Sequence, residues 1–269
     1  MEVIQLKNFI ELLLKPISFV FQKFTNLIMR DVIRNVNHNT NAEIFRLEIE
    51  LRQIKKHITK NMQEKRTAYS ALYNDRFYYL QSYQSFVSAT HVLEPLLSRL
   101  SIHSIADFGC GIGTWLYAAR QFGVEQVKGI DGDYINRELL LIDENEFCPH
   151  DLEAPIALDE KFDLAISLEC AEHLHESAAE TFVDSICAVS DIVLFSAAHV
   201  GQGGDGHINC QPISYWEQKF AVRGYVRLEI RPYFRKDADI EVWYRENMSL
   251  YVKEEQAERI RNLLSDIVR

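Results

Sequence analysis

A glycine-rich turn after an apolar run is the feature that most constrains how this chain folds. The segment ADFGCGIGTW, residues 106–115, places Gly109, Gly111 and Gly113 between a run typical of a short buried strand and a run typical of a helix. Glycine is needed where the backbone bends tightly and comes close to a ligand. The segment therefore predicts a strand–turn–helix unit with a ligand at its turn.

Strand and helix patterns alternate along the rest of the chain. We expect a helix or helix pair over residues 76–99, strands at SIADF, QVKGID, near Phe147, KFDLAISL, DIVLFSA, YVRLEIR and MSLYVK, and helices at TWLYAARQFG, ESAAETFVDSICAV and QPISYWEQKFAVRGY. Such alternation is typical of a parallel sheet covered by helices. The predicted fold class is a Rossmann-like, doubly wound, mostly parallel seven-stranded sheet with helices on both faces, plus an N-terminal helical or coiled-coil extension.

The extension is predicted to occupy residues 1–66 and the α/β domain residues 67–269. Residues 33–61 contain a heptad-spaced apolar stripe, formed by Ile44, Leu47, Leu51, Ile54 and Ile58. Such a stripe favours self-association or packing on the body of the protein. Residues 1–30 mix apolar side chains with lysines, which is typical of a helix on a membrane surface or of another packing helix. Their apolar runs are too short to span a bilayer.

Charge and cysteine content bear on partners and location. The net charge is −10, but residues 1–66 carry 12 Lys or Arg against 7 Asp or Glu, so the remainder is strongly acidic. An acidic body argues against nucleic acid as a partner. The five cysteines include no C-x-x-C pair, which favours reduced thiols. We expect a cytoplasmic protein, with peripheral contact to the inner membrane through residues 1–30 as an alternative.

Three carboxylates accompany the glycine turn. Asp107 stands two residues before the first glycine, Asp131 ends the second predicted strand, and Asp151 follows the expected third strand. A carboxylate at the position of Asp131 can accept both hydroxyls of a ribose, and Asp151 is placed to accept from an adenine amine. A nicotinamide fingerprint would need a third glycine where this chain has Thr114, so we do not expect a nicotinamide cofactor.

Together these motifs resemble those of class I S-adenosylmethionine-dependent methyltransferases, and more narrowly a bacterial subgroup associated with glycan and polysaccharide biosynthesis. The resemblance covers about residues 73–253 and rests on FYYLQSYQSF, ADFGCGIGTWL, GIDGDY, HDLEAPI, FDLAISLECAEHL, LFSAAHVGQGGDGHIN, the YW pair at 215–216 and VWYRENMSLYV. It implies S-adenosyl-L-methionine as cofactor. By the resemblance, the cofactor's methionine end lies along Asp107, Gly109, Gly111 and Gly113, its ribose at Asp131, its adenine at Asp151 and Leu152, and Glu169 borders the methionyl group.

A hydroxyl acceptor must lose its proton during methyl transfer, and histidine is suited to accept it near neutral pH. The candidates are His173, after the fourth predicted strand, and His199 and His207, after the fifth. We favour His207, which stands between glycines and Asn209. His173 has the alternative role of shaping the pocket, and His199 that of an ordinary loop residue.

The loop after the fifth predicted strand also departs from the resembling family. Relatives usually read N-E-Q-W-P where this chain has Asn209-Cys210-Gln211-Pro212-Ile213, which puts the acceptor in doubt more than the activity. The same loop also contains side chains that could bind a metal, namely His199, Asp205, His207 and Cys210. Their spacing fits no zinc pattern, and a flexible glycine loop is a poor cage for an ion. No metal site is therefore predicted.

The predicted function is S-adenosylmethionine-dependent transfer of a methyl group to a hydroxyl of a small-molecule or glycan acceptor, in polysaccharide or glycoconjugate biosynthesis. Two alternatives stay open. One is methylation of another small metabolite or natural product. The other is an adapter that binds the cofactor without catalysis and recruits a partner through its N-terminal helices.

Overall fold

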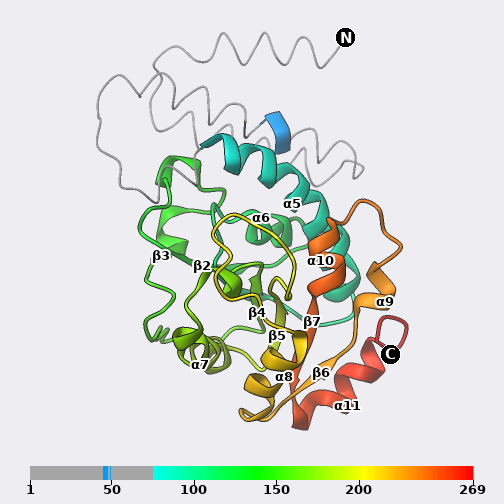
Figure 1. Ribbon diagram of the computed structural model, residues 1–269. Coiled ribbons are helices and arrows are strands. Elements are labelled where there is room, and N and C mark those ends of the chain that lie inside the picture. Colours follow the sequence, from blue (N-terminus) through cyan, green and yellow to red (C-terminus); the bar gives the residue numbers. More distant parts are fainter. Residues whose placement is uncertain (1–44, 48, 50–74, 269) are drawn as a thin grey trace, which may run out of the picture. The chain divides into compact units, whose positions relative to one another are not determined.

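A computed structural model of the protein describes residues 45–47, 49 and 75–268, with side chains described from residue 82 onward in the last range (Figure 1). The chain divides into two compact units, Met1–Lys65 and Arg66–Arg269. In the first unit the described residues are helical. The predicted membrane-surface helix and all of the heptad stripe except Leu47 lie outside the described residues.

The second unit is built on a seven-stranded sheet with the order β3-β2-β1-β4-β5-β7-β6. Its strands are β1 (Ser104–Phe108), β2 (Gln126–Asp131), β3 (Phe147–Pro149), β4 (Leu164–Leu168), β5 (Ile192–Ser196), β6 (Tyr225–Leu228) and β7 (Ser249–Lys253). The pairs among β1 to β5 are parallel, whereas β7 runs antiparallel to both β5 and β6. The predicted fold class of the domain is confirmed.

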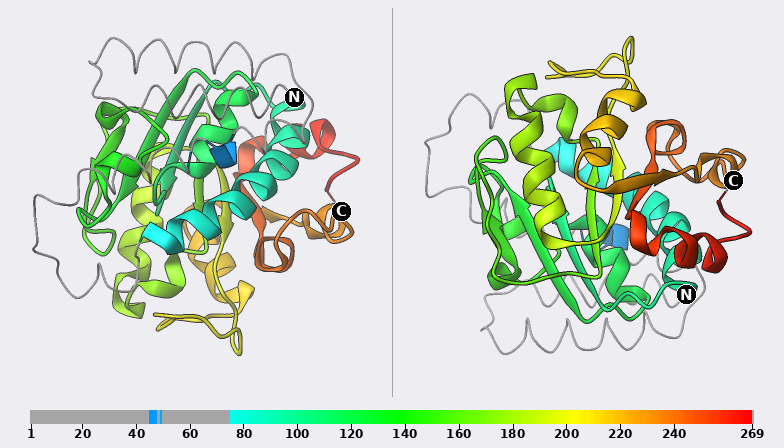
Figure 2. Two further views of the ribbon diagram at one scale, coloured as in Figure 1. Left: turned by 90° about the horizontal axis from the view of Figure 1, so that it is seen from above. Right: turned by 90° about the horizontal axis from the view of Figure 1, so that it is seen from below.

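Helices cover both faces of this sheet (Figure 2). They are α5 (Asp75–Leu97), α6 (Thr114–Gln121), α7 (Ala179–Val189), α8 (Ile213–Ala221), α9 (Arg231–Phe234), α10 (Val242–Asn247) and α11 (Glu254–Leu263), with 3-10 turns η2 (Arg137–Leu139), η3 (Glu144–Glu146), η4 (Ala171–His173) and η5 (Glu176–Ala178). Helices α5 and α6 pack together on one face, and α7 and α8 pack together on the other. Residues 76–99, expected as one helix or two, form one helix with Pro95 in its last turn.

Burial on both faces explains why the central strands are apolar along their whole length. Every residue of β1, β4 and β5 is buried, as expected for parallel strands between two helical layers. On the α7–α8 face, the ring of Phe195 in β5 contacts those of Trp216 and Phe220. Phe220 in turn stacks on Tyr251 of β7 with ring centroids 4.1 Å apart. This aromatic cluster fixes the antiparallel edge of the sheet against α8.

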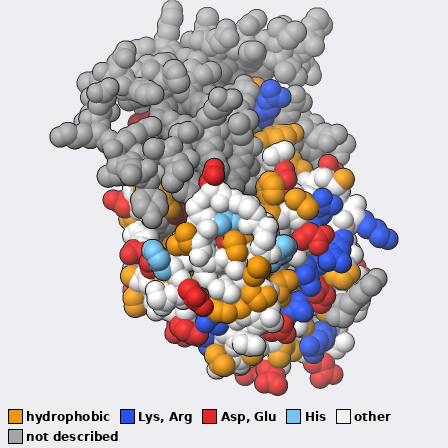
Figure 3. Space-filling model, viewed as in Figure 1, with side chains coloured by type: hydrophobic (Ala, Val, Ile, Leu, Met, Phe, Trp, Pro, Cys, Tyr) orange, Lys and Arg blue, Asp and Glu red, His pale blue; other side chains and the backbone are white. Residues whose placement is uncertain are grey.

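Charged side chains of both signs are interspersed on the described part of the face drawn in Figure 3. Within the described residues, charged side chains pair across neighbouring elements, as Arg227 does with Glu217 and Arg235 with Glu246. Of the helices within the described residues, none has the length and apolar character needed to cross a membrane.

Candidate active site

A cleft opens where β1, β2 and β4 end at the same edge of the sheet. Its volume is about 400 Å³, within the range of small-molecule sites. Ligands of open α/β sheets bind at this edge, because the strands end there and the following loops diverge. Among the predicted site residues, the cleft is lined by Asp107, Gly109, Gly111, Asp131, Leu152, Glu169, His173 and His207.

The glycine turn forms one wall of the cleft. Gly109, Gly111 and Gly113 all have positive φ values, of 88°, 55° and 86°, a region that side chains with a Cβ rarely adopt. A Cβ on Gly109 would also stand 2.4 Å from Sγ of Cys170, in the loop after β4. The turn therefore needs glycine both for its backbone conformation and for its packing against the neighbouring loop.

Asp131, at the end of β2, ties this turn to the next loop. Its carboxylate accepts the backbone N–H of Gly111 at 2.7 Å, the N–H of Gly132 at 2.6 Å and the hydroxyl of Tyr134 at 2.8 Å. A carboxylate offers about four lone-pair sites, so one remains for a ligand, and a ribose hydroxyl can replace the hydroxyl of the exposed Tyr134 at another. The position suits the ribose role that the resemblance implies.

Asp107, in β1, lies deeper in the wall. Burial raises the pKa of Asp107 well above its usual range, and the nearby charge of Asp131 raises it further. Burial likewise raises the pKa of Asp131, against the lowering effect of the N–H of Gly111. The two carboxyl groups thus share a buried corner of the cleft, where a cationic group of a ligand would be favoured.

Three predicted residues do not line the cleft. Gly113 shapes the turn from behind, and Asp151 is exposed, with its carboxylate accepting the N–H of Glu153 at 3.0 Å. His199 is exposed and its Nδ1 donates to its neighbour's carbonyl, that of Val200, at 3.1 Å. The structure therefore separates His199 from the other two candidate histidines.

Glu169 follows β4 and has a φ of 52°, the only positive φ of a non-glycine residue in the described part of the chain. Nδ2 of Asn247, at the end of α10, lies 3.1 and 3.2 Å from its two carboxylate oxygens. The loop between β5 and α8, residues 197–212, is called the glycine-rich loop here. Its Gln202 donates to Glu169 at 3.3 Å and accepts from Asn247 at 3.0 Å. These bonds hold the strained residue in place and fasten the loop over the cleft.

We expect Asn247→Ala to lower the free energy of unfolding by about 1–3 kcal/mol, the cost of leaving a buried acceptor unsatisfied. Asn247 is 3% exposed and bonds to both Glu169 and Gln202. Urea denaturation measures the change. Asn145→Ala, at an exposed position, is the matched control and should change the free energy by less than about 0.5 kcal/mol. Equal effects of the two substitutions would contradict the fastening role of Asn247.

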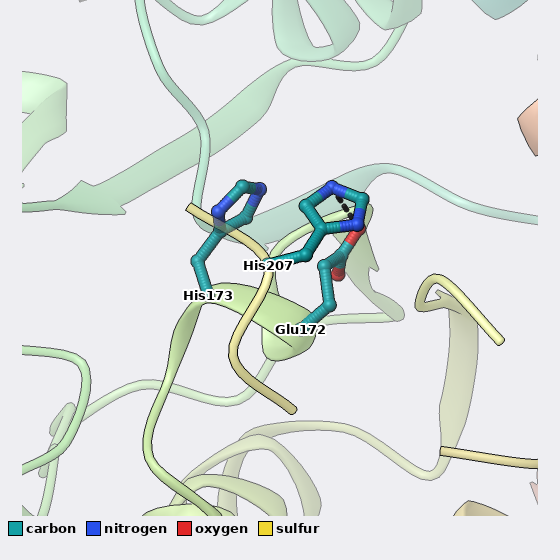
Figure 4. A group of neighbouring side chains, drawn as sticks. All are labelled: Glu172, His173 and His207. Atoms are coloured by element: carbon teal, nitrogen blue, oxygen red, sulfur yellow. Dashed lines mark ion pairs between the residues drawn. The ribbon is translucent and has the colours of Figure 1, made fainter. Parts of the chain in front are cut away.

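Glu172, His173 and His207 converge at the other end of the cleft (Figure 4). Backbone hydrogen bonds bring these side chains together. The N–H groups of Ile208 and Asn209 both donate to the carbonyl of Glu172, at 2.9 and 3.0 Å. The glycine-rich loop thereby folds back onto η4. Nε2 of His207 lies 4.0 Å from Oε1 of Glu172, and the two imidazole rings meet edge to face with centroids 4.9 Å apart.

The electrostatics of this end differ from those at the glycine turn. Burial, followed by the charge of Glu169, raises the pKa of Glu172 to about 8. Burial and the neighbouring His207 lower the pKa of His173. A histidine whose pKa is lowered stays neutral near pH 7 and can accept a proton or bind a cation.

The metal-ligand set weighed from the sequence does not assemble. Within the described residues, no group of three ligand atoms lying within 4.8 Å of one another includes His199, Asp205 or Cys210. Cys210 instead has its Sγ 3.7 Å from Nδ1 of His207. The structure brings together a different set, Glu172, His173 and His207.

Sequence reasoning missed much of the aromatic lining. Trp115 in α6 and Tyr244 in α10 both line the cleft and meet edge to face, with centroids 5.1 Å apart. Trp243, Tyr134 and Gln202 also line it. The segment VWYREN was singled out as a motif, and its two aromatic residues were the signal that could have placed α10 beside the glycine turn.

Comparison with known proteins gives a family and a fold. A family model described as a methyltransferase domain matches residues 24–191. No protein of curated function matches the chain.

Solved structures share the fold at low identity. A chain from the complex between the Haloferax volcanii Trm112 methyltransferase activator and a methyltransferase is 14% identical, with a TM-score of 0.52, covering 70% of this chain and 99% of that chain. The S-adenosylmethionine-bound amino pentose methyltransferase CalS10 from Micromonospora echinaspora is 11% identical, with a TM-score of 0.48, covering 71% of this chain and 98% of that chain. The likeness to the first of these concerns the fold alone, because the identity is 14%.

Proposed function

This chain belongs to the methyltransferase-domain family, and we propose that it transfers a methyl group from S-adenosyl-L-methionine to a hydroxyl of a small-molecule or glycan acceptor. The observation that carries the proposal is the wall formed by Gly109, Gly111 and Asp131. There the backbone of a glycine turn and a carboxylate at a strand end face the same cleft. This pairing suits a ligand with a ribose and a group that needs close approach to the backbone.

The residues of the cleft fit the cofactor. Asp131 would accept its ribose hydroxyls, Leu152 would contact its adenine, and Asp107 and Glu169 would lie toward its cationic methionyl end. When bound, S-adenosylmethionine supplies an electrophilic methyl group on its sulfonium. The protein's own work is then to align an acceptor and exclude water, since positioning accounts for much of the rate of such a transfer.

The acceptor end is assigned to the cluster of Glu172, His173 and His207. An attacking hydroxyl gives up its proton, and Nε2 of His207 is the candidate base because it faces the cleft beside Glu172. Nδ1 of His173 lies 3.2 Å from the carbonyl of Gly206, and a carbonyl only accepts, so Nδ1 is the donor. This bond orients the His173 ring and holds the glycine-rich loop near the acceptor.

A glycan hydroxyl is the acceptor we favour, with another small metabolite as the alternative. The polar loop residues Gln202, Asp205 and His207 also line the cleft, which suits an acceptor with several hydroxyl groups. The alternative of an adapter that binds the cofactor without catalysis is disfavoured. The wall formed by Gly109, Gly111 and Asp131, called the cofactor wall here, lines the same cleft as a cluster of proton-accepting side chains.

Isothermal titration tests the cofactor assignment directly. We expect the purified chain to bind S-adenosylhomocysteine with a stoichiometry of one, because the product retains the ribose, adenine and amino-acid groups that the cleft would contact. NAD is the control ligand and should give no heat, since Thr114 stands where its fingerprint needs glycine. Absence of S-adenosylhomocysteine binding would overturn the proposed function.

Methyl transfer is the second readout. Incubation with S-adenosylmethionine labelled in the methyl group, against sugar nucleotides, lipid-linked glycans and an extract of the source cell, should label an acceptor at oxygen. Labelling of a non-glycan metabolite would select the alternative acceptor. Binding of the cofactor without transfer to any acceptor would favour the adapter.

A further inference from the structure

The acceptor end of the cleft combines the side chains that commonly bind metal ions in proteins. Glu172 and His173 come from η4, and His207 comes from the glycine-rich loop after β5 (Figure 4). One ligand atom from each of the three lies within 4.8 Å of the others. Ligand atoms bonded to one ion at about 2.0–2.2 Å lie at most about 4.4 Å apart. Small side-chain rotations would therefore close the set around an ion.

The burial of the Glu172 carboxylate independently indicates that a cation binds beside it. The Glu172 side chain is fully buried, and among the described residues neither carboxylate oxygen accepts a hydrogen bond of good geometry. Of the same residues, only the backbone N–H groups of Glu172 and Ala198 come near enough to favour its charged form. A buried carboxylate without a partner is costly, and buried charges in proteins are normally paired or bound to metals. The carboxylate faces the cleft beside His207, so a cation bound there would satisfy it.

The two imidazoles are oriented as metal ligands usually are. Nδ1 of His173 donates to the carbonyl of Gly206, so in the neutral ring the lone pair lies on Nε2. Nδ1 of His207 lies 3.7 Å from Sγ of Cys210, and its Nε2 is the atom nearest Glu172. Histidines that bind metals almost always donate their second ring nitrogen to a backbone carbonyl or a similar group, which fixes the ring and its tautomer.

We propose that Glu172, His173 and His207 form a binding site for one divalent transition-metal ion, open toward the cleft, that takes two adjacent oxygen atoms of the acceptor. Two imidazoles and one carboxylate suit Mn²⁺, Fe²⁺, Co²⁺ or Zn²⁺ better than Mg²⁺ or Ca²⁺, which prefer oxygen ligands. Three protein ligands leave coordination positions for substrate oxygens. The acceptor class is then a compound with neighbouring hydroxyls, such as a vicinal diol of a sugar.

The metal site deepens the proposed function. Its role toward the acceptor oxygens rests on that proposed function, whereas the assignment of the three metal ligands does not. An ion at this position would lower the pKa of a coordinated hydroxyl. In that case Nε2 of His207 would serve as a ligand and not as the base, and the proton of the coordinated hydroxyl would pass to a water molecule in the cleft. The positive charge would also offset the repulsion between the neighbouring carboxylates of Glu169 and Glu172.

A second group of potential ligands provides the matched control. His91, Asp237 and Asp239 also lie within ligand distance of one another. They are partly or fully exposed, and His91 already pairs with Asp237 at 2.8 Å. No buried atom there lacks a partner, so we expect no tight ion binding at this group of described residues.

The test uses the full chain, stripped with EDTA and titrated with MnCl₂ or ZnCl₂ by calorimetry. We expect one ion to bind per chain. Glu172→Gln keeps the shape of the side chain and removes its charge. It should weaken ion binding by more than the roughly 10–100-fold that is lost when a residue hydrogen-bonded to a metal ligand is removed. Asp237→Asn should leave the affinity unchanged. Pulsed electron paramagnetic resonance of the Mn²⁺ form should detect coupling to histidine nitrogen in wild type and lose part of it in His207→Asn.

The outcomes separate the metal site from the proposed function. A wild-type chain that binds S-adenosylhomocysteine but neither metal ion overturns the site and leaves the function intact. Equal ion affinity in wild type and Glu172→Gln also overturns it. Loss of ion affinity in Asp237→Asn alone would overturn it as well, because the ion would then bind at His91, Asp237 and Asp239. Circular dichroism checks the fold of each variant, and His207→Asn gives a second test should Glu172→Gln not fold.

Discussion

Asp131→Ala is expected to weaken S-adenosylhomocysteine binding by at least about 100-fold. A hydrogen bond to a charged group contributes about 1.5–3 kcal/mol, so the loss of two such bonds to the ribose costs at least about 3 kcal/mol. Since about 1.4 kcal/mol corresponds to a tenfold change in affinity, this loss amounts to about 100-fold. The substitution also removes the acceptor of the Gly111 N–H and so loosens the glycine turn. Isothermal titration of the variant, at a protein concentration that resolves weak binding, gives the ratio.

Asp133→Ala is the control for this substitution. It removes the same charge two residues away, where the carboxylate is 89% exposed and pairs only with Arg137 among the interactions described. Such a surface change is worth less than about 0.5 kcal/mol, or roughly twofold in affinity. Wild-type affinity in Asp131→Ala would show that the ribose is bound elsewhere, and equal losses in both variants would point to a general effect of charge.

Gly109→Ala is expected to lower the free energy of unfolding by about 2–5 kcal/mol. Left-handed backbone costs a residue with a Cβ about 1–2 kcal/mol, and overpacking adds about 1–3 kcal/mol. Both apply here, because the φ of Gly109 is 88° and a new Cβ would stand 2.4 Å from Sγ and 2.7 Å from Cβ of Cys170. Urea denaturation followed by circular dichroism measures the change.

Gly123→Ala separates the two causes. Gly123, after α6, has a φ of 90°, but a Cβ there would meet no atom within 4 Å. Only the backbone cost of about 1–2 kcal/mol applies to it. The difference between the two variants therefore measures the close packing of the turn against the loop after β4. If both variants are destabilised equally, the contact with Cys170 does not constrain the turn.

The proposed cofactor wall and the proposed metal site divide the cleft into two ends with different chemistry. Glu169 stands between them, in a strained conformation held by Asn247 and Gln202. Its neighbour Glu172 is three residues along the chain but faces the histidines instead. In the proposed arrangement one short segment after β4 serves both ends, and substitutions in it should affect cofactor and metal binding separately.

The sequence by itself determined the order of the seven strands and of helices α5 to α8, the glycine turn and the position of Asp131, whereas the short helices α9 and α10 and the helix α11 were not predicted. These features depend on the spacing of apolar residues and on local backbone needs, which act over a few neighbouring residues. The third strand is short, so only its approximate position near Phe147 could be predicted. The resemblance to methyltransferases rested on the same local motifs.

Only the tertiary structure decided how the acceptor end is assembled. The sequence offered three candidate histidines and favoured His207, but it could not show which of them meet. Bonds from Ile208 and Asn209 to the carbonyl of Glu172 bring His207 to His173, and His199 stays outside the cleft. The approach of α10 to the glycine turn likewise joins segments far apart in the chain. Such contacts depend on how the loops and helices pack around the sheet, which no local spacing encodes.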